Sequence, residues 1–289
     1  MRFSILTGLG GTGDYTQLAL AAEASGFHSL AIPDSIFYPE ITESDYPYMK
    51  TDAVRQVLDG VPVLDPFVAM ATMAAVTDTL RFYPAVMKVP VRQPLVLAKA
   101  LSSLAVVTGN RVSLGAGLSP WKEDFTFNGV DFDLRGKLFD ECLEIIRAAM
   151  SGEYFEHQSD NFTIGRCKLS PVPTASVPIL IGGHAKPALR RAARLGDGWV
   201  SANSDYETLK GLLEILAEFR QEYGTDERTC FEVHAFDVTA RSLEDYKRLE
   251  ALGVTDICVN PWNPYDPEIT LDKKIAGIER FARGIITQY

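Results

Sequence analysis

The chain has 289 residues, of which 46% are hydrophobic and 23% are charged, and this composition excludes a disordered or fibrous protein. Its formal net charge of −10 would repel a phosphate backbone, so we expect no nucleic-acid partner. No stretch approaches the ~20 apolar residues of a membrane span, and the amino-terminal apolar run is too short for a secretion signal, so we expect no membrane partner.

Short apolar runs bounded by Gly, Pro, Asn and Asp alternate with segments of helical spacing along the chain. The runs predict strands over 3–6, 30–32, 82–86, 112–114, 179–181, 199–200, 231–238 and 257–259. The helical spacing predicts amphipathic helices over 18–25, 67–74, 97–105, 138–146, 209–216 and 271–282. Two shorter segments, 187–195 and 242–252, are also predicted helices, and Ser242 with Asp245 resembles a capping box at the start of the second.

Eight strand–helix units in strict alternation predict an α/β fold with parallel strands. Eight units in this length favour a (β/α)8 TIM barrel over an open doubly wound sheet, and we expect one barrel domain over residues 1–289. Gly8, Gly10 and Gly13 do have the GxGxxG spacing of a Rossmann fold. Against that alternative, Asp34 comes late for the acidic residue that usually ends the second strand.

Three segments are too long to be plain connections. They are 34–62 after the second predicted strand, 118–133 after the fourth strand and 151–177 after the fourth helix. The loops that follow strands line the active face of a barrel, so the first two are predicted walls of a substrate pocket. The third is expected at the bottom or the side of the barrel.

Two glycine pairs end predicted strands and are open to two interpretations each. Gly182 and Gly183 close a strand and open a helix, so they either seat a phosphate or supply a turn that requires φ > 0. Gly115 and Gly117 leave room either for a flat ligand or for close packing inside the barrel. Pro84 interrupts the third strand and predicts a bulge there.

Few side chains suggest chemistry by themselves. Asp34 follows the second strand, where a carboxylate is either functional or caps the long loop. Trp121 either covers a pocket or packs its own loop. No Ser/His/Asp set, HExxH motif or carboxylate pair stands out, so hydrolase chemistry has no support. The four cysteines lie far apart, which predicts no disulfides, no metal site and a reduced, cytoplasmic chain.

A series of motifs in order along the chain resembles the luciferase-like monooxygenase superfamily, and within it the branch that uses the deazaflavin coenzyme F420. The series consists of AAEASGF at 21–27, PD at 33–34, PVRQP at 90–94, GNRVSLGAG at 109–117, WKEDF at 121–125, IGGH at 181–184 and RAARLGDGW at 191–199. The resemblance implies a barrel that holds a deazaflavin or isoalloxazine ring in its mouth. It also implies a non-prolyl cis peptide bond between Ala85 and Val86, in a bulge of the third strand.

The resemblance further implies a set of site residues. The expected cofactor contacts are Asp34, Ala85, Val86, Leu118, Ser119, Gly182, Gly183 and His184, and the expected substrate pocket includes Ser35 and Trp121. The aromatic residues Phe37, Tyr38, Tyr46 and Tyr48 are further candidates for the pocket walls. Sugar-phosphate dehydrogenases of this branch carry a catalytic His and Glu where this chain has Ser35 and Pro120, so we assign no catalytic residue and disfavour glucose-6-phosphate oxidation.

The function that the resemblance implies is hydride transfer between F420 and a small organic substrate, catalysed by a homodimer. One alternative is an FMN-dependent monooxygenase, which would use oxygen and a reduced flavin supplied by a partner reductase. Another is a non-catalytic flavin- or deazaflavin-binding protein.

Overall fold

A parallel barrel forms the centre of the protein. The structure is a computed structural model that describes residues 1–8, 11–42, 45–46, 55, 58–264, 266 and 268–289. Its nine-stranded parallel sheet runs in the order β3-β2-β1-β11-β10-β9-β8-β5-β4. Phe82 of β3 bridges to Val112 just before β5, so the two ends of the sheet meet. Because β3 and β4 are two halves of one interrupted strand, the sheet is an eight-stranded barrel, which confirms the predicted fold class and excludes the Rossmann alternative.

Each predicted run overlaps one barrel strand. The barrel strands are β1 (Arg2–Leu6), β2 (Ser29–Ile32), β3 (Arg81–Pro84), β4 (Met87–Lys88), β5 (Leu114–Gly117), β8 (Ile179–Gly182), β9 (Gly198–Ser204), β10 (Glu232–Asp237) and β11 (Asp256–Val259). The largest error concerns β9, which extends to Ser204 rather than ending at 200. Its second half is polar and small, so periodicity gave no signal, and pairing with β10 across a register shift between His234 and Phe236 extends it.

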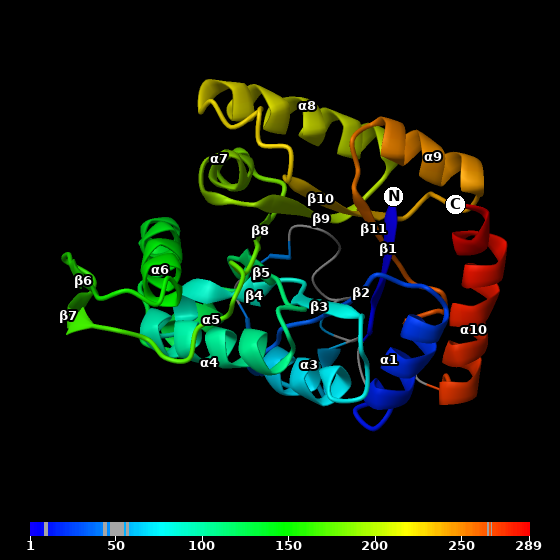
Figure 1. Ribbon diagram of the computed structural model, residues 1–289, viewed down its shortest axis with the longest axis horizontal. Coiled ribbons are helices and arrows are strands. Elements are labelled where there is room, and N and C mark those ends of the chain that lie inside the picture. The colour runs from blue at the N-terminus through cyan, green and yellow to red at the C-terminus, as the bar shows by residue number, and fades with distance from the viewer. Residues whose placement is uncertain (9–10, 43–44, 47–54, 56–57, 265, 267) are drawn as a thin grey trace.

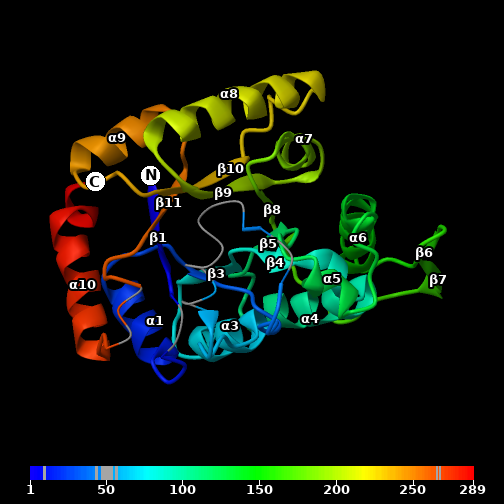
Figure 2. The ribbon, with the colours of Figure 1, turned by 180° about the vertical axis from the view of Figure 1, so that it is seen from behind.

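Helices surround the barrel in chain order, as Figures 1 and 2 show. They are α1 (Tyr15–Ala24), α3 (Pro66–Ala74), α4 (Pro94–Val107), α6 (Arg135–Met150), α7 (Lys186–Leu195), α8 (Tyr206–Glu222), α9 (Leu243–Ala251) and α10 (Leu271–Gly284). Shorter helical turns are η1 (Val89–Val91), α5 (Glu123–Thr126) and η2 (Ile286–Gln288). Ser242 and Asp245 form the predicted capping box at α9. No helix in the described part of the chain is long and apolar enough to cross a membrane.

The strands bury side chains on both faces, and this divides the core into two layers. The larger layer lies between the sheet and the helices. The smaller layer fills the inside of the barrel and consists of Ala31, Tyr83, Leu180, Val200, Phe236 and Cys258, with Leu6, Ala85 and Val86 packed against it. Side chains therefore close the barrel interior, and a ligand has room only above this inner layer.

The segment 151–177 contains a feature that the sequence analysis missed. It forms an antiparallel hairpin of β6 (Phe155–Gln158) and β7 (Thr163–Cys167), which lies beside α6 at one side of the molecule (Figure 1). Glu141 of α6 holds it by hydrogen bonds to His157 and Asn161, each at 2.7 Å, and to the Ser159 hydroxyl. The hairpin strands are largely exposed, so they lack the apolar pattern on which the other strand predictions rested.

A network of charged groups closes the amino-terminal end of the barrel. The Arg2 guanidinium lies 3.1 Å from Glu232 and 2.5 Å from Asp256, and His234 lies 2.7 Å from Glu232. Ligand atoms of Glu232, His234 and Asp256 lie within 4.8 Å of one another, a spacing that a metal ion could use. Because Arg2 already pairs with both carboxylates, we interpret the group as an ion-pair network on the stability face of the barrel.

Histidine 28 borders this network and makes the fold sensitive to acid. Burial and the nearby charge of Arg2 lower the pKa of His28 to about 4. In the unfolded chain His28 is exposed and binds a proton below pH ~6.5, whereas in the folded protein it stays neutral until the pH nears 4. The stability of the folded state is therefore unaffected by this group above pH ~6.5 and decreases as the pH falls from there toward 4.

We therefore expect the variant His28→Gln to lose less stability than the wild type between pH 7 and pH 4.5. Urea unfolding at both pH values measures the difference. Equal losses in the two proteins would contradict the assignment of this pH dependence to His28.

Candidate active site at the barrel mouth

A cavity of about 370 Å³ lies at the carboxyl ends of the barrel strands, and we call it the mouth cavity. Its size falls within the ~300–1,000 Å³ typical of small-molecule sites. It is lined by Leu6, Pro33, Asp34, Ser35, Tyr46, Leu58, Ala85, Val86, Lys88, Leu118, Ser119, Pro120, Trp121, Gly182, Gly183, Val200, Ser201, Ala202, Asn203 and Phe236. The carboxyl ends of the strands are the catalytic face of such barrels, so this cavity is the candidate active site.

The interruption of the third strand shapes the floor of the mouth cavity. The peptide bond between Ala85 and Val86 is cis, as the resemblance implied. A Cβ atom on Gly117 would lie 2.4 Å from Cγ2 of Val86, and one on Gly182 would lie 2.9 Å from Cγ1 of Val86. A Cβ atom on Gly115 would lie 1.9 Å from the carbonyl oxygen of Pro84. These glycines therefore allow close packing around the irregular segment, one of the two roles left open by the sequence.

The turn after β8 depends on glycine for a second reason. Gly183 has a φ of +119°, which side-chain-bearing residues rarely adopt. Its carbonyl oxygen accepts a hydrogen bond from Nε1 of Trp199 at 2.8 Å, which fixes the turn against β9. Gly182 and Gly183 both line the mouth cavity, and α7 begins three residues later at Lys186. The turn therefore has the backbone conformation that requires glycine, and it also faces the cavity.

Histidine 184, another predicted cofactor contact, lies outside the lining of the mouth cavity, although the glycines before it are part of that lining. Its Nε2 accepts a hydrogen bond from the backbone N–H of Ala202 at 2.8 Å. Burial lowers the pKa of His184 below its ordinary value, so the ring is neutral at pH 7. It positions the part of β9 that lines the cavity and supplies no positive charge for a phosphate.

The Asp34 carboxylate links three segments around the cavity. Its two oxygens accept hydrogen bonds from the guanidinium of Arg92 at 2.7 and 2.9 Å. One of these oxygens also accepts from the backbone N–H of Lys88 at 2.8 Å. The side chain is only 1% exposed. Asp34 therefore ties the end of β2 to β4 and to the turn after it, and both of its oxygens already accept hydrogen bonds.

A second ion pair lies beside the cavity on the loop after β5. Nζ of Lys88 lies 2.6 Å from Asp124, and these side chains are 12% and 2% exposed. The Ser119 hydroxyl donates to the same Asp124 oxygen and accepts from the backbone N–H of Trp121 at 3.1 Å. The Trp121 ring stacks on Tyr46 with their centroids 5.6 Å apart. The loop is thus fixed at both ends, which sets Trp121 as a wall of the cavity.

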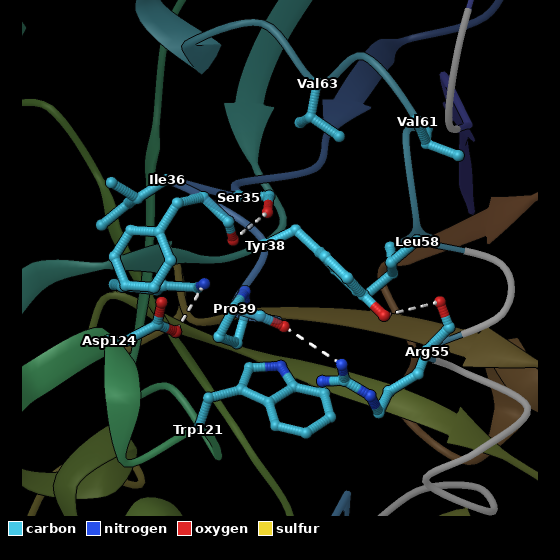
Figure 3. Close-up of a pocket in the computed structure, with 12 residues that line it drawn as sticks. Ser35, Ile36, Tyr38, Pro39, Arg55, Leu58, Val61, Val63, Trp121 and Asp124 are labelled. Carbon is cyan, nitrogen blue, oxygen red and sulfur yellow. Dashed lines mark hydrogen bonds and ion pairs between the residues drawn. The ribbon is translucent and has the colours of Figure 1, made fainter. Parts of the chain in front are cut away.

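A smaller cavity of about 210 Å³ adjoins the mouth cavity, and we call it the side pocket (Figure 3). It is lined by Ser35, Ile36, Phe37, Tyr38, Pro39, Arg55, Leu58, Val61, Val63, Lys88, Trp121 and Asp124. The two cavities share Ser35, Leu58, Lys88 and Trp121, so they are neighbours across these four residues. Tyr48, another predicted wall residue, lies outside the described residues.

The structure brings together nine of the ten predicted site residues around the mouth cavity, and His184 is the exception. Their roles in binding stay predictions. The sequence analysis missed the lining residues from β9 and Phe236. The residue pattern of a barrel strand does not show which of its residues lie in the inner core and which lie above it, at the cavity. It also missed Lys88, although a lysine directly after an apolar run at a strand end is a signal of a polar site.

Residues 4–248 match the luciferase-like monooxygenase family, and the chain belongs to this family. An uncharacterised protein of Mycobacterium tuberculosis is 44% identical over 292 residues, which cover 100% of both chains. The F420-dependent glucose-6-phosphate dehydrogenase of Tsukamurella paurometabola is 25% identical over 198 residues, which cover 66% of this chain and 53% of that protein.

Solved structures show the same fold. An F420-dependent secondary alcohol dehydrogenase, in complex with an F420–acetone adduct, matches with a TM-score of 0.79 at 15% identity and covers 100% of this chain and 99% of that one. The monooxygenase RslO1 from Streptomyces bottropensis matches with a TM-score of 0.78 at 16% identity over 100% of both chains. The same barrel thus occurs in an F420-dependent dehydrogenase and in a monooxygenase. Membership of the luciferase-like monooxygenase family identifies this chain as an oxidoreductase enzyme.

The packing of Gly115 leads to a testable outcome. We expect Gly115→Ala to lower the free energy of unfolding by about 3 kcal/mol, because the added methyl group collides with the backbone of Pro84. Gly211→Ala in α8 is the control: nothing lies within 4 Å of the added atom, and we expect a gain of about 0.5–1 kcal/mol. Urea unfolding of both variants checks this, and equal effects would contradict the packing argument.

The buried ion pair between Asp34 and Arg92 leads to another testable outcome. We expect Arg92→Met to cost about 3–5 kcal/mol, because it leaves a buried carboxylate without its cation. The control is Arg283→Met in α10, which removes an exposed pair with Glu279 and should cost no more than ~1 kcal/mol. Chemical denaturation measures both values. A loss no larger than that of the control would show that Arg92 does not compensate Asp34.

Proposed function

We propose that the protein is an F420-dependent oxidoreductase that transfers a hydride between the deazaflavin ring and a small organic substrate. The observation that carries the proposal is the mouth cavity, which combines an apolar floor with a rim of glycine backbone. The relative named as an F420-dependent glucose-6-phosphate dehydrogenase supports the choice of cofactor, as does the F420-dependent secondary alcohol dehydrogenase that shares the fold.

The residues of the cavity fit a flat ring with a phosphate-bearing tail. Leu6, Val86, Val200 and Phe236 offer an apolar surface against which a ring can lie. On the rim, the turn 182–183 lacks side chains, so a ligand can approach the backbone closely. The amino terminus of α7 follows, and the helix dipole favours negative charge there. We therefore place the ring over Val86 and the phosphate end toward this turn.

When bound, the deazaflavin would supply or accept the hydride. The chain's own part is to position the ring and to exclude water. Asp34 is fully engaged by Arg92 and Lys88, so it holds the wall in place and does not act as a base. Lys88 holds its Nζ protons where the two cavities adjoin, within reach of a polar group of a ligand that spans both.

Direct binding tests the cofactor. We expect the apo-protein to bind F420 saturably with a micromolar Kd, measured by calorimetry, and to bind FMN much more weakly. F420 should quench tryptophan fluorescence, and Trp121→Phe should lose most of this quenching because Trp121 lines the cavity. The control is Trp262→Phe, since Trp262 is not among the lining residues.

Tight binding of FMN alone would replace this proposal with the monooxygenase, which needs a partner reductase. Binding of neither compound would overturn the proposed cofactor site. Binding of F420 without turnover of any compound in a broad substrate screen would favour a non-catalytic binding protein. A homodimer stays a prediction.

A further inference from the structure

The side pocket differs in character from the mouth cavity. Polar groups of Ser35, Arg55, Lys88 and Asp124 form part of its lining. The remaining walls are aliphatic and aromatic and include Val61, Val63, Tyr38 and Trp121 (Figure 3). Such walls suit the hydrocarbon part of a ligand.

The charged groups of the side pocket do not cancel. Lys88 and Asp124 form an ion pair at the edge shared with the mouth cavity. Arg55 is the remaining charged group of the lining, and within the described part of the chain no salt bridge neutralises it. The described lining therefore carries one unbalanced positive charge, although the whole chain has a formal net charge of −10.

Local contacts hold the Arg55 guanidinium without removing its charge. Its Nη2 donates hydrogen bonds to the carbonyl oxygens of Pro39 at 3.1 Å and of Glu40 at 2.7 Å. The guanidinium lies over the ring of Tyr38, 4.8 Å from the ring centroid. The Tyr38 hydroxyl in turn donates to the backbone carbonyl of Arg55 at 3.3 Å. The guanidinium is thus oriented in advance, which reduces the entropy lost when it binds an anion.

We propose that the side pocket is the substrate subsite, and that it takes a molecule with an apolar, preferably aromatic, body and a single carboxylate that pairs with Arg55. This inference rests on the proposed oxidoreductase function, because the shared edge at Ser35, Lys88 and Trp121 directs the other end of such a molecule toward the mouth cavity. Because Nη2 of Arg55 already donates to two carbonyl oxygens, the carboxylate would accept a charge-assisted hydrogen bond from Nη1 or Nε.

The test uses two probes of nearly equal shape, 3-phenylpropionate and its neutral amide, 3-phenylpropanamide. Calorimetry with the wild-type apo-protein should show the carboxylate binding at least about tenfold more tightly than the amide, because charge-assisted hydrogen bonds are the strong ones. Raising the salt concentration should weaken the carboxylate alone.

A matched pair of variants assigns the preference to Arg55. Arg55→Gln should bring the carboxylate to the affinity of the amide and leave F420 binding unchanged. The control is Arg166→Gln in the hairpin, which removes the same charge from an arginine that also lies over a tyrosine ring, 5.3 Å from the centroid of Tyr154. Val63→Phe should fill the side pocket and abolish binding of both probes, which locates them independently of any cofactor.

Equal affinities for the two probes in the wild type would overturn the inference. So would a preference that survives Arg55→Gln, or a carboxylate that competes with F420 for the mouth cavity. The F420 titration separates the two proposals. Binding of F420 without a carboxylate preference removes only the substrate class, whereas carboxylate binding without F420 binding removes only the cofactor. Binding of neither overturns both.

Discussion

The contact of Val86 with the ends of β5 and β8 determines the shape of the barrel mouth. Its side chain lies where any side chain on Gly117 or Gly182 would have to be, so three neighbouring strands are locked together at one point. Because the inner core is closed below this level, Val86 is both the upper surface of the core and the floor of the mouth cavity. Packing and ligand space are therefore set by one side chain, and neither can change without the other.

Charged groups have different roles at the two ends of the barrel. At the amino-terminal end Arg2, Glu232 and Asp256 pair among themselves, and burial keeps His28 neutral. The charged groups at this end therefore interact mainly with one another. At the carboxyl end, the Asp34–Arg92 and Lys88–Asp124 pairs serve to hold loops around the cavities. Arg55 differs from these residues, because no salt bridge within the described part of the chain neutralises it.

Much of the fold could be predicted from the sequence because each strand–helix unit carries its own signal. Strands buried on both faces appear as apolar runs, and helices that cover a sheet show a regular apolar spacing. The signal disappears where the backbone is held by pairing and not by burial, as in the second half of β9 and in the exposed hairpin of β6 and β7. For the same reason the prediction placed the end of β9 at 200, when the strand continues to Ser204.

The parts of the site that could be predicted are those in which the backbone conformation requires a particular residue type. The glycines at 182 and 183 could be located because their residue type is demanded by local geometry. The sequence could not place the His184 ring, since a hydrogen bond to Ala202, 18 residues away, directs it. Lys88 and Asp124 are 36 positions apart and meet only because β4 pairs with β5 and α5 follows. Side-chain pairings of this kind depend on strand order, which residue patterns do not contain.

The exchange of residues at the mouth changes what the site can do. The resemblance implies that Ser35 and Pro120 stand where sugar-phosphate dehydrogenases carry a His and a Glu, and neither a serine nor a proline can take that acid–base role. Both line the mouth cavity, so the departure lies within the site itself. The charged groups of the two cavities are the paired Asp34, Lys88 and Asp124, together with Arg55, for which the described part of the chain offers no salt bridge. A site with this composition is suited to holding an anionic, apolar molecule in place. We therefore expect its selectivity to depend on where the substrate's charge is bound and not on a histidine or glutamate at these two positions.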